Sequence, residues 1–563
     1  MRKLRILVSG GLLLLAYLGL SYRLFHIQII GFDKFSNMAE RSYFVQVDKV
    51  SPPRGNIYDR NGIPLALNRH TYSVGYSPVR LEDPENFVSL VSNSLGISPS
   101  LFRKQINSNR FFWIKRHASP SEVCPLLSLG NSGLVINREN HRFYPQSPIA
   151  SHIIGCVGMD NQGLSGIEFN YEHYLRGSYG EERRIRDAKG RVIYSASSRE
   201  ETSLPTDIYL TSDTNLQHIA ERELRKGFER FKPNWALALI QKPSTGEILA
   251  MAFCPGYDNN AGVPSVEKMK NLSISNIFEP GSTYKIVMAA AALEEGICSP
   301  EDIFFCENGE YEVGGFPIRD FHSYGDLNFG DILVHSSNIG TAKIGAMLGR
   351  NLMYKYSRDF GFGNFSGIRL PGEARGILKK PDSWSGTSLS RISFGQEVGV
   401  TALQLVGAFS TLASGGILYE PQIVLKTIKD GREQEVNPLK VRRVISEENA
   451  RILRGILAEV VSRGTGDQAE VKGYRAAGKT GTAQKFNPET LTYAKDRYVA
   501  LFGGFIPADD PELTILVVFD EPDESLYWGG HVAAPVFSRI AEGAVNYLNI
   551  LPDEKMPVMA SRK

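Results

Sequence analysis

The chain has 563 residues, well above the ~250–300 at which one hydrophobic core stops growing, so at least two domains are expected. Hydrophobic residues make up 42% and charged residues 22% of it, as in an ordinary globular protein. The net charge of +2 gives no sign of a nucleic-acid partner, and no period of ~20–50 residues indicates a repeat fold.

The first predicted element is a membrane anchor. Three basic residues lie within positions 1–5, and an uncharged, mostly apolar run follows over residues 6–22. This run is at the short end of the ~17–25 residues that span a bilayer. The basic residues predict a cytoplasmic tail at 1–5, a single pass through the inner (cytoplasmic) membrane, and a periplasmic or extracellular position for the rest. A cleaved signal peptide is the alternative, but no small-residue cleavage site follows the run.

Residues 23–205 have the pattern of an extended, mostly β domain. Short alternating runs such as 43–47 are separated by turn signals rich in proline, glycine and asparagine. The polar stretch 188–204 is predicted to lead into the second domain.

Residues 206–552 are predicted to form that second domain, followed by a tail at 553–563. Strand patterns and a closing helix flank a helix-rich stretch at 280–415; the strands are predicted at 235–241, 247–253, 475–484, 498–506 and 513–519, and the helix at 533–551. Strands at both ends with helices between them predict an α+β fold, in which one antiparallel sheet packs between helices.

The five cysteines are an odd number for an oxidising compartment, and their spacing fits no metal site. Free, partly buried thiols are expected, with a disulfide between Cys298 and Cys306 as the alternative.

Three short segments carry the candidate chemistry. They occur in order, 54 and then 143 residues apart: Ser282-Thr283-Tyr284-Lys285, Ser336-Ser337-Asn338 and Lys479-Thr480-Gly481-Thr482. Each is common by chance, but together they supply a nucleophile, two candidate bases or proton shuttles, an amide and a cation for a carboxylate. This is the set that a serine acyltransferase needs to work without histidine.

Ser282 leads into the apolar run 286–293, which predicts a buried helix with the serine in its first turn. Lys285 lies three residues on and shares a face with Ser282. A lysine can take the serine proton only if burial or a nearby cation, such as Lys479, lowers its pKa. Alone, this pair would be read as a helix cap and a surface lysine; the other two segments argue against that reading.

The other two segments predict substrate contacts. Ser336 can relay a proton, and the amide of Asn338 can hold a peptide bond. Lys479, with Thr480 and Thr482, can bind a carboxylate, and Gly481 would let the substrate approach the backbone. The adjacent His335 is interpreted as structural, because a lysine-based site needs no imidazole.

A competing interpretation comes from Gly473–Thr480, which matches the phosphate-binding P-loop pattern. The strand-like run 515–521 imitates the metal-binding strand of such proteins. A P-loop must open a helix, however, and residues 482–497 are polar and aperiodic. Too little chain follows for the α/β core that such a site needs, and the segment is predicted to lie outside the cell. A nucleotide-binding protein is therefore the less favoured hypothesis.

The chain resembles the class B penicillin-binding proteins, the membrane-anchored transpeptidases of bacterial cell-wall synthesis, over nearly its whole length. The stretches that carry the resemblance in the N-terminal module are Arg54-Gly55-Asn56-Ile57-Tyr58-Asp59-Arg60-Asn61-Gly62 and Gly163-Leu164-Ser165-Gly166-Ile167-Glu168. In the catalytic domain they are Phe278-Glu279-Pro280-Gly281-Ser282-Thr283, Phe394-Gly395-Gln396 and Gly529-Gly530-His531-Val532-Ala533-Ala534-Pro535.

The resemblance implies a role for each motif residue and requires neither cofactor nor metal. Ser282 would be acylated with Lys285 as its base, Ser336 would relay protons, and Asn338 would bind the substrate amide. Lys479 and Thr480 would engage the terminal carboxylate, and the backbone N–H groups of Ser282 and Thr482 would form the oxyanion hole. The implied reaction acylates the enzyme with a D-Ala-D-Ala stem peptide and then cross-links it to a neighbouring amine; β-lactams would remain bound to the serine.

Within class B, the sequence looks most like the septal, cell-division type, with the elongation type as the close alternative. The implied partners are a SEDS-type glycan polymerase and other division proteins. A carboxypeptidase, a β-lactamase and a non-catalytic scaffold are the remaining alternatives. For the N-terminal module as a whole, contact with a partner is the favoured role, with the membrane polymerase as the expected partner. For any single charge, such as Arg54 or Glu168, local bracing of the β framework by salt bridges is an equally open alternative.

Overall fold

The structure is a computed structural model that describes residues 2–42, 44–50, 53–79, 81, 83–107, 110–129, 133–177, 180–186, 192–198, 204–487, 492–523 and 527–553. The chain divides into two compact units. The first comprises residues 1–53 and 176–205, and the second comprises residues 54–175 and 206–563.

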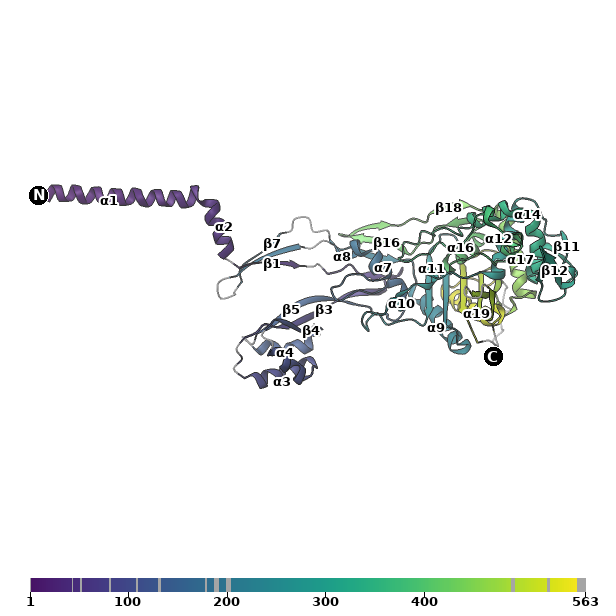
Figure 1. Ribbon diagram of the computed structural model, residues 1–563, viewed down its shortest axis with the longest axis horizontal. Helices are drawn as coiled ribbons and strands as arrows, with labels where there is room; N and C mark the ends of the chain where they lie inside the picture. The colour runs from purple at the N-terminus through teal and green to yellow at the C-terminus, as the bar shows by residue number, and fades with distance from the viewer. Residues whose placement is uncertain are drawn as a thin grey trace, which may run out of the picture. The chain divides into compact units, whose positions relative to one another are not determined.

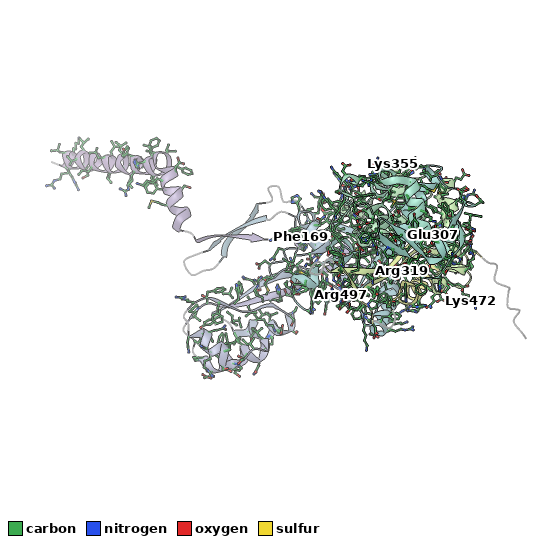
Figure 2. All side chains as sticks on the ribbon, turned by 45° about the vertical axis from the view of Figure 1, so that its right-hand side comes forward. Phe169, Glu307, Arg319, Lys355, Lys472 and Arg497 are labelled. Atoms are coloured by element: carbon green, nitrogen blue, oxygen red, sulfur yellow. The ribbon has the colours of Figure 1, made fainter. Side chains whose placement is uncertain are left out.

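The first unit holds the predicted anchor. Helix α1 (Arg2–Phe25) continues into a π-helical turn (His26–Ile30), is followed by α2 (Phe32–Ser42), and has no buried residue. Figure 2 shows its side chains projecting on all sides. The helical segment Arg2–Ile30 contains an 18-residue stretch with a mean hydropathy of 1.8 and is long and apolar enough to cross a membrane. The predicted run 6–22 lies inside it.

A small antiparallel sheet completes the first unit, in the order β1 (Phe44–Val50), β6 (Gly180–Arg186) and β7 (Val192–Ser198). The predicted strand 43–47 starts at Phe44, because Tyr43 lies outside the described residues. Of the predicted crossing segment 188–204, only residues 192–198 and 204 are described.

The second unit is built on a five-stranded antiparallel sheet. Its order is β10 (Ile248–Cys254), β9 (Trp235–Gln241), β21 (Leu513–Asp520), β20 (Thr492–Ile506) and β19 (Ala477–Asn487). All five predicted strands are present. The largest difference is that β20 begins at Thr492, six residues before its predicted start. Strand β19 is one edge of this sheet.

Helices cover both faces of this sheet, which is why β21 is buried along its whole length (Figure 1). Ala236, Ala238 and Ile240 of β9 pack with α9 (Thr214–Phe231) and α19 (Ala534–Leu548). Leu237 and Leu239, which point the other way, join the core that contains α12 (Lys285–Glu294) and α16 (Ala402–Ala413). The predicted α+β fold, with a sheet between helical layers, is confirmed.

A seven-stranded sheet links residues 57–143 to residues 206–563 of this unit. Strand β2 (Ile57–Tyr58) pairs in parallel with β8 (Asp207–Leu210), which pairs in turn with β16 (Val424–Lys429). The remaining strands are β3 (Pro64–Tyr76), β4 (Phe112–Ala118), β5 (Leu134–Phe143) and β17 (Arg432–Glu435). Helices α3 (Pro84–Leu95) and α4 (Pro99–Ile106) pack on β3 and β4 around an apolar core of their own (Figure 1).

The other helices of this unit are α5 (Pro120–Val123), α6 (Ser151–Ile154), α7 (Gly166–Asn170), α8 (Glu172–Arg176), α10 (Val266–Met269), α11 (Leu272–Ser275), α13 (Phe329–Val334), α14 (Asn338–Asp359), α15 (Ser388–Ser393), α17 (Glu447–Arg463) and α18 (Gly529–Val532). Short strand pairs are formed by β11 (Ile303–Phe305) with β14 (Asp326–Asn328), by β12 (Glu310–Val313) with β13 (Phe316–Arg319), and by β15 (Ile417–Tyr419) with β18 (Lys440–Arg443).

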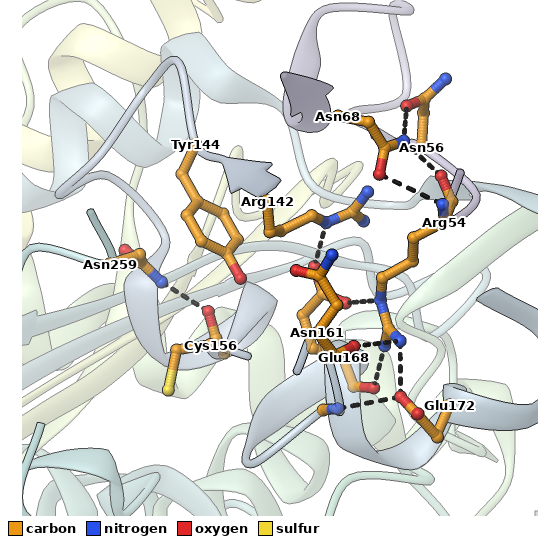
Figure 3. Close-up of polar contacts among 12 residues, drawn as sticks. Arg54, Asn56, Asn68, Arg142, Tyr144, Cys156, Asn161, Glu168, Glu172 and Asn259 are labelled. Atoms are coloured by element: carbon orange, nitrogen blue, oxygen red, sulfur yellow. Dashed lines mark hydrogen bonds and ion pairs between the residues drawn. The ribbon is translucent and has the colours of Figure 1, made fainter. Parts of the chain in front are cut away.

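Arg54 and Glu168 form a buried ionic network (Figure 3). Arg54 Nε lies 2.5 Å from one carboxylate oxygen of Glu168, and Arg142 Nε lies 2.6 Å from the other. Arg54 also pairs with Glu172 at 2.6 Å. The side chains of Arg54, Arg142 and Glu168 are at most 2% exposed. For Arg54 and Glu168 the structure supports the bracing alternative, because side chains removed from solvent cannot contact a partner. Contact between the N-terminal module as a whole and a partner stays a prediction.

Candidate functional site

Ser282 lies on a 3₁₀ turn (Gly281–Tyr284) that runs directly into the buried helix α12, whose first residue is Lys285. In such a turn, residues three apart lie over one another, so Ser282 and Lys285 share a face as predicted. Gly281 adopts a φ of +54°, which favours glycine. A Cβ on Gly395 would lie only 2.1 Å from the Gly281 carbonyl oxygen, so this second glycine lets its loop support the turn.

Lys285 joins the first motif to the second. Its Nζ donates to the Ser336 carbonyl oxygen at 2.6 Å, to Ser336 Oγ at 3.2 Å and to Asn338 Oδ1 at 2.9 Å. Because Ser336 Oγ is a hydroxyl, it can also donate to a neutral Nζ, which allows a proton to pass between the two groups. The arrangement therefore suits proton transfer.

Two fully buried lysines meet in the site. Burial, followed by the charge of Lys479, lowers the pKa of Lys285 well below that of a free lysine; the negative charge of Asp320 opposes this with a smaller effect. Burial also lowers the pKa of Lys479 to about 7. Lys479 Nζ is buried and has no hydrogen-bond partner among the described residues. The site thus contains one lysine held by three oxygens and another with an open hydrogen-bonding position.

The second motif lies at the start of α14, where the carboxylate of Asp320 holds it in place. Asp320 accepts hydrogen bonds from Ser337 Oγ at 2.6 Å and from the backbone N–H groups of Asn338 at 2.5 Å and Ile339 at 3.1 Å. A carboxylate is favoured at a helix N-terminus, where these N–H groups have no partner within the helix. Ser336, just before, has a φ of +59°, a strained value for a non-glycine residue that the surrounding bonds maintain.

The third motif lies on the edge strand β19. Thr480 Oγ1 lies 2.9 Å from Thr465 Oγ1, and Thr482 Oγ1 accepts from the Gly529 N–H at 3.0 Å. The Thr482 carbonyl oxygen lies 3.1 Å from where a Cβ on Gly281 would sit, so β19 contacts the turn that carries Ser282. The three motifs therefore converge on one place.

The packing of the fold requires a glycine at position 481, in addition to the expected approach of a substrate. A Cβ there would lie 2.9 Å from the Pro280 carbonyl oxygen, 2.8 Å from Leu501 and 3.0 Å from Thr283. Its missing side chain thus lets the turn that carries Ser282 pack on β19. Contact between Gly481 and a substrate remains a prediction.

The phosphate-binding interpretation of Gly473–Thr480 does not fit the structure, because Lys479 and Thr480 lie inside a strand and not at the start of a helix. All five cysteines are free, so Cys298 and Cys306 do not pair. His335 stacks on Tyr324 with ring centroids 5.4 Å apart, in agreement with a structural role.

Sequence reasoning missed Asp320 and Thr465. Asp320 lies 17 residues before the Ser337 that it binds, at the end of a short hairpin, and no local pattern marks it. Thr465 lies between two glycines, which is a turn signal, but nothing in that signal indicates a partner 15 residues away.

Comparisons with known proteins agree with this geometry. Residues 236–542 match the penicillin binding protein transpeptidase domain, and residues 49–210 match the penicillin-binding protein dimerisation domain. Stage V sporulation protein D of Bacillus subtilis is 33% identical over 98% of this chain and 86% of its own length. Peptidoglycan D,D-transpeptidase FtsI of Escherichia coli is 32% identical over 96% of this chain and 92% of its own.

Solved structures are similar as well. The crystal structure of penicillin binding protein 3 from Mycobacterium tuberculosis, complexed with aztreonam, aligns with a TM-score of 0.71 and 27% identity. The alignment covers 90% of this chain and 98% of that one.

Proposed function

The chain belongs to the class B penicillin-binding proteins and is a serine-type peptidoglycan D,D-transpeptidase, and on that premise we propose that Ser282 is its acylated nucleophile. The observation that carries the assignment is the position of Lys285, held by Ser336 and Asn338 on the same helical face as Ser282.

In the acylation step, Lys285 takes the proton of Ser282 Oγ, and the oxygen attacks the carbonyl carbon between the last two D-alanines of a stem peptide. The backbone N–H groups of Ser282 and Thr482 stabilise the oxyanion. As the intermediate collapses, Ser336 relays the proton to the departing D-alanine amine, which leaves an ester on Ser282.

In the second step, an amine of a neighbouring stem peptide attacks the ester carbonyl. The new amide bond forms as the bond to Ser282 Oγ breaks, and the amine's proton returns to the serine through Lys285. β-Lactams acylate Ser282 in the same way and remain attached. Water in place of the amine gives a carboxypeptidase side reaction.

Substrate recognition is assigned to the remaining motif residues. Lys479, buried and without a hydrogen-bond partner in the described part of the chain, is open to the terminal carboxylate, with Thr480 and Gly481 beside it on β19. Asn338 is assigned to the substrate amide, and Thr482 to the backbone near the scissile bond. An extended peptide can also pair with the open edge of β19.

The cellular setting follows from the anchor and the relatives. The helix Arg2–Ile30 and the FtsI relative indicate a single-pass membrane protein. We place the N-terminus in the cytoplasm and the rest outside the inner membrane, because basic residues precede the apolar run. We also keep residues 23–205 as a pedestal and 206–552 as the catalytic domain. We also propose septal synthesis with a SEDS-type polymerase, as the resemblance to the septal type implies, and the elongation role is the alternative.

Labelling with a fluorescent penicillin tests the nucleophile. The wild-type protein is expected to label covalently, with the label on the peptide that contains Ser282, and Ser282→Ala is expected to abolish labelling while the protein stays folded. Ser299→Ala, at an exposed serine after α12, is the matched control and should label normally. Equal labelling of Ser282→Ala and the wild type would remove the assignment.

A further inference from the structure

A cavity of about 1150 Å³ lies beside the site. Its lining includes residues 277–279, just before the Ser282 turn, and residues 483–486, just after Thr482 on β19. A second cavity of about 250 Å³ shares Phe316, Thr387, Arg391 and Tyr493 with the first and is also lined by Asn338. The two cavities therefore adjoin, and together they extend from Asn338 to the far part of β19.

Glu279 lines the larger cavity with one oxygen satisfied and the other not. Its Oε1 accepts from the Glu397 N–H at 2.9 Å and from the Tyr493 hydroxyl at 3.1 Å. Its Oε2 is buried and has no hydrogen-bond partner among the residues that the structure describes. Leaving a buried acceptor unpaired costs about 1–3 kcal/mol, more for a charged group, so this position favours an incoming donor.

The cations of the cavity wall are committed elsewhere or lie at its rim. Arg391 pairs with Glu397 at 3.2 Å. Lys485 binds Asp520 at 2.8 Å and Glu521 at 2.7 Å, and Lys379 is exposed. No ion pair to Glu279 occurs in the part of the chain that the structure describes.

The surroundings of Glu279 disfavour its ionised form. Burial, with a smaller contribution from the charge of Glu397, raises the pKa of the Glu279 carboxyl to about 7, against the two hydrogen bonds that it accepts and the guanidinium of Arg391. A cation bound beside it would stabilise the ionised form.

The path of the substrate leads to this cavity. A stem peptide whose terminal carboxylate lies at Lys479 and Thr480 and which extends along β19 advances by ~3.3 Å per residue. The residue that precedes the two D-alanines then lies roughly two to three strand residues further on, near Thr482 and Ala483, where the larger cavity begins. Its side chain can therefore enter the cavity.

Resting on the proposed transpeptidase function, we propose that this cavity is a recognition subsite for a primary amine of a stem peptide, with Glu279 binding the ammonium group. The amine belongs either to the donor, on the side chain before the two D-alanines, or to the acceptor that attacks the ester on Ser282. Both sources present the same alkylammonium chemistry.

The donor arm of the test compares three soluble peptides that end in D-Ala-D-Ala and differ only in the preceding residue: lysine, Nε-acetyl-lysine or norleucine. The rate of D-alanine release gives kcat/KM for each. The wild type should prefer the lysyl peptide by roughly tenfold, about what one charge-assisted hydrogen bond provides. Glu279→Gln should lose that preference, whereas Glu301→Gln, which removes the same charge from an exposed turn, should keep it.

The acceptor arm starts from the preformed acyl-enzyme and measures how added amines divide it between aminolysis and hydrolysis. If Glu279→Gln loses only the preference for the lysyl peptide, the bound amine belongs to the donor side chain. If it loses only aminolysis by added amines, the bound amine belongs to the acceptor. Equal use of the lysyl and acetyl-lysyl peptides by the wild type, together with unchanged aminolysis in Glu279→Gln, overturns the subsite.

Two further readouts keep the test decisive. If Glu279→Gln does not fold, Tyr493→Phe replaces it as the test variant. This change removes only one hydrogen bond to the Glu279 carboxylate and should weaken the amine preference. The preference of the wild type for the lysyl peptide can also be measured without any variant. Penicillin labelling of the wild type separates the two proposals. A protein that is not acylated at Ser282 fails the proposed function. A protein that is acylated, but shows neither a donor preference for the lysyl peptide nor an effect of Glu279→Gln on aminolysis, fails only the subsite.

Discussion

Glu168→Gln removes the one negative charge that two buried guanidinium groups share. The glutamine keeps the shape of the side chain and can still accept a hydrogen bond, so the change tests charge and not volume. Arg54 keeps its second carboxylate, Glu172, at 2.6 Å. Arg142 has no other ion pair among the described residues, and its Nη1 and Nη2 already have no partner. The loss therefore falls on Arg142.

The expected cost follows from the burial of the network. Arg142 and Glu168 are both 0% exposed, so water cannot replace the lost partner. Removing one member of a buried ion pair typically costs ~3–5 kcal/mol, which is on the order of a 10²–10⁴-fold shift in the folding equilibrium. Glu85→Gln is the matched control: its pair with Arg103 is 73% and 51% exposed, and a surface pair contributes only ~0–1 kcal/mol.

Urea denaturation of both variants measures this difference. Glu168→Gln should lower the unfolding midpoint clearly with little change in the slope, and it should reduce the fraction of protein that fluorescent penicillin labels at 37 °C. Glu85→Gln should match the wild type in both measurements. The bracing interpretation is refuted if Glu168→Gln unfolds at the wild-type midpoint, labels normally and nonetheless impairs division, because that outcome would require contact with a partner.

Two predictions concern the site itself. Lys285 accepts a proton only when neutral, so the acylation rate should rise with pH through its lowered pKa and fall about tenfold per unit below it. Lys285→Arg, which keeps the charge but cannot act as a base, should slow acylation by ~10²–10⁴-fold. A rate that does not change with pH over the whole range in which the protein stays folded would contradict the role. Asp320→Asn should weaken the start of α14 by ~1–3 kcal/mol and slow acylation measurably, because Ser336 and Asn338 lose their support; wild-type labelling by this variant would mean that Asp320 acts on stability alone.

The catalytic sheet could be predicted from sequence because its strands are locally distinctive. The apolar runs that became β9, β10 and β21 are buried on both faces, and their turns contain proline or glycine. The start of β20 was missed because residues 492–497 are polar: they extend the strand beyond the core. Pairing with β19 at Tyr493 and Phe486 keeps this part in the sheet.

The grouping of residues 54–175 with residues 206–563 in one compact unit could not be predicted. It depends on contacts between distant segments, such as the parallel pairing of Ile57 with Ile208 and the bonds from Thr214 to Asp59. Neither segment carries a local sign of its partner. The burial of Arg54 could not be predicted either. Charged side chains are rarely buried unless they are paired, and the sequence does not show which distant residue pairs with Arg54.

In the site, spacing and residue type identified the motif residues, whereas the residues that support them were invisible. Lys285 was predicted to need a lowered pKa, and the structure supplies the two causes that were expected, burial and Lys479. The sequence assigned no role to Asp320, and Glu279 was named only as part of a motif stretch. Each makes hydrogen bonds to residues that are distant in sequence, and such contacts leave no periodic pattern in the sequence.

The two buried lysines can take different parts in the reaction because different causes set their pKa values. Burial holds the pKa of Lys479 at about 7. If the terminal carboxylate of the substrate binds Lys479 as proposed, its negative charge favours the charged form of this lysine and raises that pKa. The same negative charge acts on Lys285 against the charge of Lys479. Burial, the first cause of the lowered pKa of Lys285, is therefore what keeps Lys285 able to accept the proton of Ser282.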